Sequence, residues 1–313
     1  MAFHIKLKPL LVVGGVSSRS KSGRSSVVVQ FGSRVGPAKR EIPSTSLRAG
    51  SSLRLKNGSA QDDSRGVIVE LHFYLEGSFM NLKGIQLTWL GHATFRIVTP
   101  GGQTIIIDPW IMNNPMCPAS EKSVKKVDIL LCTHGHFDHI GDAVEVIKQH
   151  NPQVVGIPEL CGWLEKKGAK KIAMMNKGGT QKVGDIKVTM VHADHSCGIQ
   201  DGDQIIYGGE ACGYVVEFEN GVKIYHAGDT NVFGDMAIIR ELYAPEIVML
   251  PIGDHFTMGP REAAYACNLL KAKTVIPMHF GTFPVLTGTP AELQKLVPGM
   301  EVAAMKPGVT VGN

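Results

Sequence analysis

The sequence predicts a mixed α/β domain in which stacked sheets carry helices on their outer faces. From Met80 onward, short apolar runs rich in β-branched residues alternate with turn signals. Strand-like runs follow one another directly at first and later alternate with helical patterns, an order typical of sheets flanked by helices. The hydrophobic fraction of 43% is ordinary for a globular protein. We therefore expect one well-packed domain of roughly 230 residues.

The expected strands open with an antiparallel meander formed by IQLTWL (85–90), FRIVTP (95–100) and TIIIDP (104–109). VDILLCT (127–133) is almost continuously apolar, which indicates a strand buried on both faces. The later predicted strands are VVGIP, IKVTMVHA, GYVVEFEN, VKIYHAGDT, EIVMLPIGD and TVIPMHF. Helical spacing of apolar residues predicts helices over 140–150 and over 259–272, the second with Pro260 in its first turn.

The first 60 residues have a different composition from the rest. They hold eleven Lys and Arg, twelve Ser and one acidic residue, Glu41. A basic, serine-rich and acid-poor stretch buries too little apolar surface to fold and is typical of an organelle transit peptide. The excess of Ser over Arg favours a chloroplast over a mitochondrion. Residues 61–79 are expected to be a linker, although VIVELHFYLEGSF (67–79) is apolar enough for an added strand.

Charge and cysteine usage exclude several classes of protein. The chain has 32 basic and 28 acidic residues, so removing the first 60 leaves 21 basic and 27 acidic. This mildly acidic remainder argues against a nucleic-acid surface. The six cysteines form no CxxC pair and are expected to be free, mostly buried thiols. No apolar run approaches the length of a membrane span. We expect a small-molecule substrate and leave a homo-oligomer open.

THGHFDHIGD (133–142) is the strongest functional signal. Residues two apart in an extended chain share a side, so His134 and His136 can converge on one metal ion where the buried strand ends. Asp138 and His139 lie where the chain turns toward the next helix and can face a second metal. Imidazole and carboxylate ligands without thiolate suit zinc, manganese or iron. Solvated loop histidines are the alternative interpretation.

Further ligands are expected at the ends of other strands. His195 in VHADHSCG, Asp229 in YHAGDTN and His279 in VIPMHFGT each follow an apolar strand beside a glycine-containing loop. His192 competes with His195 for the same role. His226 lies inside a strand and is expected to be buried or to support a ligand. Asp108 in IIIDP is expected to orient the ligand loop.

THGHFDHIGD, AGDT and the late MH, in this order, resemble the metal-ligand motifs of the metallo-β-lactamase superfamily. LTWLGHATFRI, IIIDPW, IYHAGDTNVFGDM, LPIGDHFTMGP and VIPMHFGTFP resemble one branch of it, the uncharacterised metal-dependent hydrolases related to ascorbate-6-phosphate lactonase. The resemblance covers residues 82 to about 310 and implies a four-layer αββα sandwich with the site at one edge. By this resemblance, metal one is held by His134, His136 and His195, metal two by Asp138, His139 and His279, and Asp229 bridges both. His195 is favoured over His192 because Ser196 follows it, and Cys197 is expected to pack near the site.

Two loops supply the remaining candidates. His92 in LGHAT is expected to line the pocket, with a structural turn histidine as the alternative. Asp254 and His255 in GDHFTMGP (253–260) are candidates for substrate contact or for protonation of the leaving group. A solvated loop that caps the next helix is the alternative for this pair. The residues expected to act in catalysis are thus Asp138, Asp229 and His255.

Together these features predict a metal-dependent hydrolase, with two divalent ions, zinc above all, and a metal-bound hydroxide as nucleophile. Two divalent ions opposed by two carboxylates and a hydroxide leave net positive charge, which favours a small anionic ester, lactone or phosphoester. No GxSxG elbow or catalytic-cysteine motif is present. The alternatives are a mononuclear iron oxygenase of the persulfide dioxygenase type and an RNA-processing nuclease. A metal-free binding module is a further alternative, although all seven ligands implied by the resemblance are present.

Overall fold

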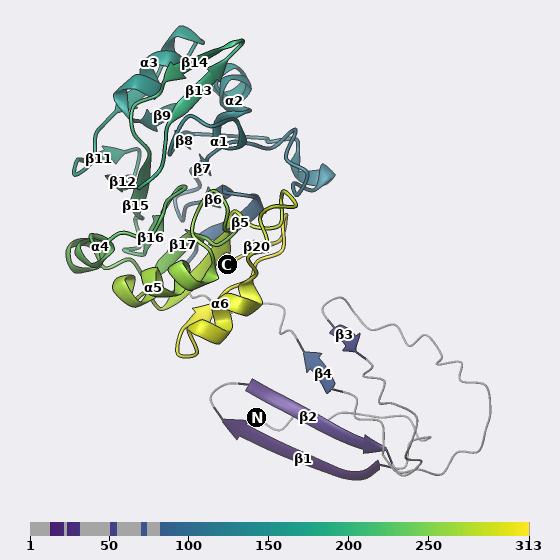
Figure 1. Cartoon of the computed structure of the whole chain (residues 1–313). Coiled ribbons are helices and arrows are strands. Elements are labelled where there is room, and N and C mark those ends of the chain that lie inside the picture. The colour runs from purple at the N-terminus through teal and green to yellow at the C-terminus, as the bar shows by residue number, and fades with distance from the viewer. Residues whose placement is uncertain (1–12, 22–23, 32–50, 55–69, 74–81, 313) are drawn as a thin grey trace. The chain divides into compact units, whose positions relative to one another are not determined.

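The computed structural model describes residues 13–21, 24–31, 51–54, 70–73 and 82–312. The chain divides into two compact units, residues 1–78 and Phe79–Asn313. Figure 1 follows the chain from the N-terminus in purple to the C-terminus in yellow.

Two short antiparallel strand pairs occur in the first unit, where the sequence predicted no element before residue 60. β1 (Val13–Lys21) pairs with β2 (Arg24–Phe31), and β3 (Ser51–Arg54) with β4 (Glu70–Phe73). The run of three valines at 27–29 has high β propensity, which the compositional argument ignored. The rest of 1–60 and of 61–79 lies outside the described residues, and targeting stays a prediction.

The second unit contains two seven-stranded mixed sheets, and the predicted mixed α/β sandwich is confirmed. The first sheet has the order β10-β9-β8-β7-β6-β5-β20. Its strands are β5 (Gln86–Gly91), β6 (Thr94–Val98), β7 (Thr104–Ile107), β8 (Ile129–Leu131), β9 (Gln153–Gly156), β10 (Ile172–Met174) and β20 (Thr310–Val311). The second has the order β11-β12-β15-β16-β17-β18-β19. Its strands are β11 (Thr180–Val183), β12 (Ile186–His192), β15 (Cys212–Glu217), β16 (Lys223–His226), β17 (Ile247–Pro251), β18 (Thr274–Met278) and β19 (Glu301–Val302).

The two sheets share one plan, although the sequence shows no internal repeat. In the first sheet an antiparallel meander, β5-β6-β7, continues into the parallel strands β8, β9 and β10. In the second, antiparallel β12-β15-β16 continues into parallel β17, β18 and β19. Parallel strands end at the same edge of a sheet, so the C-terminal ends of several strands lie together at one edge of each sheet.

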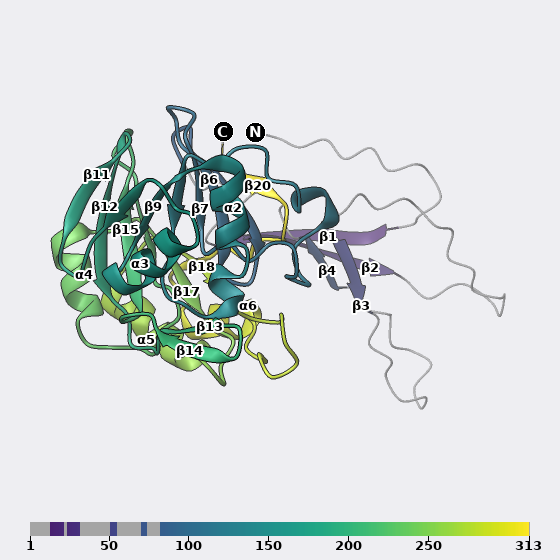
Figure 2. The same ribbon diagram turned by 90° about the horizontal axis from the view of Figure 1, so that it is seen from above.

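Helices cover the outer faces of both sheets (Figures 1 and 2). The described helices of this unit are η1 (Ala119–Glu121), α1 (Phe137–Ile140), α2 (Ala143–His150), α3 (Pro158–Lys166), α4 (Met236–Tyr243), α5 (Pro260–Leu270) and α6 (Pro290–Leu296). Of these, α2 to α6 pack on the sheets. One core cluster joins α2 and α3 to the first sheet and fills the space between the sheets. A second cluster packs α4, α5 and α6 on the second sheet. Burial of these apolar faces is the main force that holds the layers together.

Two local features differ from the sequence prediction. The predicted helix over 140–150 is broken at Gly141 and Asp142, because the Asp142 carboxylate accepts backbone hydrogen bonds from Ile111 and Met112. A hairpin of β13 (Gly198–Asp201) and β14 (Gln204–Tyr207), which the sequence did not predict, forms a small sheet of its own after His195. Both features bring a chain segment against the loop that follows β8.

All six cysteines are buried and free, as their spacing predicted. Within the described part of the chain, no helix combines the length and the apolar character needed to cross a bilayer. Burial raises the pKa of Cys161 and Cys267 to about 12, so these thiols stay protonated and inert.

Candidate metal centre

The predicted ligands come from strand ends that meet at one edge of the two sheets. The loop after β8 supplies His134 and His136, and α1 supplies Asp138 and His139. β12, β16 and β18 end just before His195, Asp229 and His279. The sandwich therefore brings together seven side chains that are separated by up to 145 positions in the chain.

His134, His136 and His195 form one set, which we call the three-histidine group. Ligand atoms of all three lie within 4.8 Å of one another. His134 Nε2 is 3.0 Å from His136 Nδ1, and the His195 ring centroid is 5.1 Å from those of both partners. The His136 Nε2 atom lies 3.3 Å from Ser196 Oγ, which leaves Nδ1 to face the group. The geometry fits three imidazoles around one ion.

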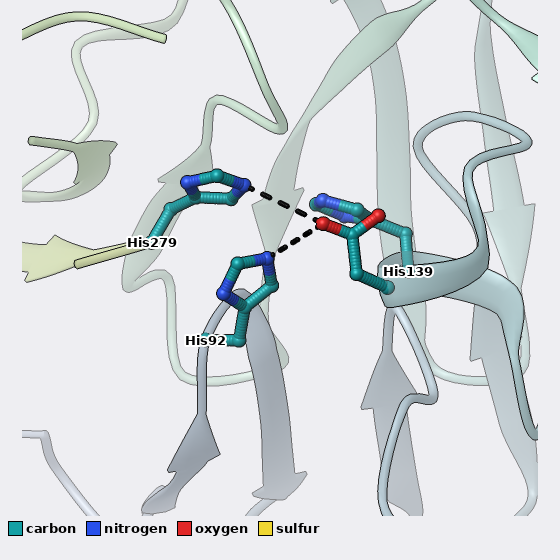
Figure 3. Close-up of side chains that lie close together, drawn as sticks. His92, His139 and His279 are labelled. Atoms are coloured by element: carbon teal, nitrogen blue, oxygen red, sulfur yellow. Dashed lines mark hydrogen bonds and ion pairs between the residues drawn. The ribbon is translucent and has the colours of Figure 1, made fainter. Parts of the chain in front are cut away.

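Asp138, His139 and His279 form a second set, the Asp138 group, and His92 joins it. Ligand atoms of these four residues lie within 4.8 Å of one another. Figure 3 shows the rings of His92 and His279 directed at the same carboxylate. His92 Nε2 is 3.0 Å and His279 Nε2 is 3.8 Å from Asp138 Oδ2. The sequence left His92 between a pocket-lining and a structural turn histidine, whereas its Nε2 atom touches a predicted ligand directly.

Asp229 lies between the two groups. Its Oδ2 atom is 3.2 Å from His139 Nε2 and 3.0 Å from His279 Nε2. The same oxygen is 3.7 Å from His195 Nε2 and 4.0 Å from His134 Nε2. One buried carboxylate oxygen thus faces imidazoles of both groups, which is the position required of a bridging ligand.

Buried hydrogen bonds orient these imidazoles. Asp108 Oδ2 accepts from His139 Nδ1 at 2.8 Å and from the Thr133 hydroxyl at 2.7 Å. The Thr133 oxygen in turn accepts from His134 Nδ1 at 3.0 Å. Because both Nδ1 atoms donate, both Nε2 atoms point into the centre, as a metal would require. Asp108 thus contacts the ligand loop where its sequence position suggested, and Thr133 takes part in the same hydrogen-bond chain, which sequence reasoning missed.

Several polar atoms at the centre are buried without a hydrogen bond of proper geometry. Among the described residues these include His139 Nε2, both ring nitrogens of His279 and Asp229 Oδ1. A buried polar atom without a partner is costly, so such a cluster calls for an explanation. Ring nitrogens and carboxylate oxygens that converge with few hydrogen bonds of proper geometry are the donor set that a divalent cation takes. The residues present therefore fit metal ions.

Burial and charge act differently on the histidines. Burial lowers the pKa of His134 well below its ordinary value and also lowers the pKa of His136 and His195. Neutral imidazole is the form that binds a metal. Burial alone would lower the pKa of His139 too, but the carboxylates of Asp229 and Asp108 outweigh burial and hold it well above the ordinary value. A metal at His139 Nε2 would displace that proton.

The backbone is strained around the Asp138 group. His92, Asp108 and His279 adopt left-handed φ values of 55°, 49° and 54°. Such values are uncommon outside glycine and cluster at functional sites. The amide of His279 donates to the carbonyl of His92 at 3.1 Å, and their ring centroids are 3.9 Å apart. Packing and this backbone hydrogen bond thus hold the two histidine rings against each other at a tilt of 43°.

Three predicted residues lie elsewhere. His192 is exposed at the end of β12, with its Nδ1 atom 3.4 Å from Lys177 Nζ, so the choice of His195 matches the geometry. Asp254 and His255 are exposed on the loop before α5, and the His255 ring packs on that of Phe256. No hydrogen bond or ion pair of the described residues joins Asp254 or His255 to a predicted ligand.

His226 and Cys197 are buried close to the predicted ligands in the chain. His226 Nε2 donates to the Ala93 carbonyl at 3.0 Å, and its Nδ1 accepts from the Gly228 amide at 3.1 Å. Both nitrogens are occupied, so His226 connects the segment next to His92 with the segment next to Asp229. The Cys197 thiol is buried and donates to the Gly208 carbonyl at 3.1 Å.

The fold and this cluster define a class: an αββα sandwich that gathers histidines and aspartates for metal binding at one edge. Residues 86–279 match the model of the beta-lactamase superfamily domain. A metal-dependent hydrolase from Koribacter versatilis is 68% identical over 231 residues, which cover 74% of this chain and 99% of that protein. One from Solibacter usitatus is 56% identical over 229 residues, or 72% and 99% of the two chains. The chain belongs to the UPF0173 metal-dependent hydrolase family of the metallo-β-lactamase superfamily.

A solved structure agrees with this assignment. Igni18, a metallo hydrolase from the archaeon Ignicoccus hospitalis, is 35% identical with a TM-score of 0.65. The match covers 72% of this chain and 97% of Igni18. About a quarter of the present chain thus has no counterpart in these relatives.

Proposed function

We propose that the chain hydrolyses a small ester, lactone or phosphoester by means of two divalent metal ions. The three-histidine group and Asp229 would hold one ion, and the Asp138 group and Asp229 the other. The observation that carries this proposal is the position of Asp229 Oδ2, which lies 3.0–4.0 Å from imidazole nitrogens of both groups. A carboxylate oxygen at that point can join an ion in one group to an ion in the other, whereas a one-ion site would use it for that ion alone.

When bound, the metal ions would supply a hydroxide nucleophile at neutral pH and polarise the scissile carbonyl or phosphoryl oxygen. The residues contribute position and charge. His92 holds Asp138 Oδ2 at 3.0 Å, and Asp108 holds His139 Nδ1 at 2.8 Å. These buried contacts fix the ligands before substrate arrives, so little reorganisation is needed during reaction.

Charge supports a substrate that carries or develops negative charge near the ions. Two divalent ions exceed the charge of Asp138 and Asp229 and of one hydroxide by about one unit. Positive charge that is already in place stabilises an oxyanion as it forms. The acidic balance after residue 60 disfavours an RNA substrate.

The test combines metal analysis with a hydrolysis screen. We expect two divalent ions per purified chain, zinc or in its place manganese or iron, and turnover of at least one lactone, ester or phosphodiester. Treatment with a chelator should abolish turnover and zinc should restore it. One iron per chain with oxygen consumption would instead establish an iron oxygenase, and cleavage of RNA alone a nuclease.

His255 remains our candidate for protonation of the leaving group. It is exposed on the loop before α5, and this loop begins at Gly253, which packs against the backbone of His279. We expect His255→Ala to lower kcat roughly 10²-fold on a substrate with a poor leaving group and much less on an activated ester. An unchanged kcat on both substrates would eliminate this role.

Chloroplast import of the protein through residues 1–60 is a separate part of the proposal, supported by their basic, acid-poor composition. A fusion of residues 1–60 to a fluorescent protein should enter chloroplasts. Entry into mitochondria would show that residues 1–60 target that organelle instead. A mature protein that starts at Met1 would contradict cleavage of a transit peptide.

A further inference from the structure

An aromatic surface borders the Asp138 group. The rings of Trp110 and Phe283 stack with centroids 5.8 Å apart, and the Phe137 ring meets Trp110 edge-on at 5.9 Å. Trp110 is buried, Phe283 is half-buried and Phe137 is 60% exposed. We call these three residues the aromatic platform. A buried indole thus supports two phenyl rings that solvent can reach.

The aromatic platform is continuous with the predicted ligands. Phe137 lies between His136 and Asp138 in the chain and begins α1. The His92 ring centroid is 5.7 Å from that of Phe283 and 5.2 Å from that of Trp110, while His92 Nε2 touches Asp138. A single side chain, His92, therefore separates the rings from a metal-facing carboxylate. A substituent that extends from a metal-held oxygen past His92 would meet these rings.

The chemistry of the platform selects an apolar group. Two basic side chains, Lys122 and Arg96, have partners other than the platform. Lys122 donates to the Met112 carbonyl, and Arg96 pairs with Glu121. Within the described part of the chain, the cation over an aromatic ring is Lys167 over Trp163 on α3, away from the platform. Exposed aromatic rings beside a few polar groups are typical of sites that bind the apolar part of a ligand.

We propose that the aromatic platform binds the alkyl or aryl group of an ester or lactone whose carbonyl oxygen lies at the metal centre. This inference rests on the proposed function and narrows it to substrates with an apolar acyl group. Hydrolysis would add water across the acyl C–O bond and release a carboxylic acid and a hydroxyl group. The acid would keep its alkyl or aryl group against Phe137 and Phe283.

Binding of hydroxamic acids tests the platform without any need for turnover. A hydroxamate chelates a metal ion and carries an alkyl chain of chosen length. Titration calorimetry would compare acetohydroxamic, butyrohydroxamic, hexanohydroxamic and phenylacetohydroxamic acids on the zinc-loaded full chain. We expect the Kd to fall about three- to fourfold per methylene while the chain lies on the rings, since each buried methylene contributes about 0.8 kcal/mol. A Kd independent of chain length, or no binding by any member, would overturn the proposal.

Substitutions of the two phenyl rings test whether the dependence of Kd on chain length arises at the aromatic platform. Phe137→Ala and Phe283→Ala should each weaken hexanohydroxamic acid roughly tenfold and leave acetohydroxamic acid and metal content unchanged. Tyr265→Ala is the matched control, because Tyr265 is 62% exposed but lies on α5. Equal weakening of the short and long acids by Phe137→Ala would show that the ring supports the metal site and not the ligand. A chain-length effect without hydrolysis of any ester would instead count against the proposed reaction.

Discussion

The three-histidine group and the Asp138 group use similar side chains but are built differently. Two members of the first, His136 and His195, are partly exposed, and the group rests on ordinary loop backbone. In the second, Asp138 is partly exposed, but His139 and His279 are fully buried, and His279 and its neighbour His92 are held in left-handed backbone. Strained conformations persist only where the surroundings determine them strongly. We therefore expect the Asp138 group to respond more sharply to changes outside its ligands.

The largest expected effect comes from the residue that both groups share. Asp229→Asn keeps the shape of the side chain and removes the charge that faces four imidazoles. We expect a loss of both metal ions and a fall in kcat of at least a thousandfold, because the bridging carboxylate and its charge disappear together. Metal analysis and kinetics on any substrate found in the screen would measure both.

Asp203→Asn, in the exposed turn between β13 and β14, is the matched control and should change neither quantity. Retention of two tightly bound ions in Asp229→Asn would show that the two groups bind metals independently.

The next prediction separates the two groups. A Cβ atom at Gly253 would lie 2.0 Å from the backbone oxygen of His279. Gly253→Ala should therefore displace His279, and the protein should keep one ion of two. We expect an accompanying loss of about 1–3 kcal/mol in the free energy of unfolding, typical of overpacking. Metal stoichiometry and denaturant unfolding would measure these effects.

Gly234→Ala is the control, since nothing lies within 4 Å of the added atom. Loss of both ions, or of neither, in Gly253→Ala would contradict the division into two groups.

A milder prediction tests the hydrogen bond from His92. Asn tolerates left-handed backbone, but it is too short to span from Thr282 to Asp138 as His92 does at 2.9 and 3.0 Å. His92→Asn should weaken binding of the second ion 10- to 100-fold, as loss of a residue that orients a ligand does. The melting temperature of the metal-free protein should also fall, because Asn fills less of the buried space beside Trp110 and His279 than an imidazole does.

His192→Asn, at an exposed histidine away from the centre, should leave both affinities unchanged. If His92→Asn binds two ions as tightly as the unaltered chain, the hydrogen bond from His92 to Asp138 does not contribute to metal binding.

The contrast between the groups also explains what the sequence could predict. The alternation of strand and helix patterns predicted the layers of the sandwich. The ligand-type residues at strand ends predicted the metal-binding residues, which the fold brings together. His134 and His136 are close in space because they are close in the chain. The roles of Thr282 and Phe283 depend on where a late loop packs against a β5–β6 turn some 190 residues earlier, which no local spacing encodes. His92 itself was left between two interpretations for the same reason.

The smallest expected effect concerns the thiol beside the three-histidine group. Burial raises the pKa of Cys197 to about 11, so at neutral pH it is a thiol and a poor metal ligand. Its Sγ atom donates to the Gly208 carbonyl at 3.1 Å, a bond that a hydroxyl can replace. Cys197→Ser should therefore change metal affinity and stability only slightly, within about twofold and 1 kcal/mol. Competition with a chromogenic chelator would measure the metal affinity, and denaturant unfolding would measure the stability.

A tenfold loss of metal affinity without loss of stability would make Cys197 a ligand and end the description of this group as histidine-only. Cys161→Ser, at a buried thiol on α3, would show how much of any stability change is due to burial of a hydroxyl alone.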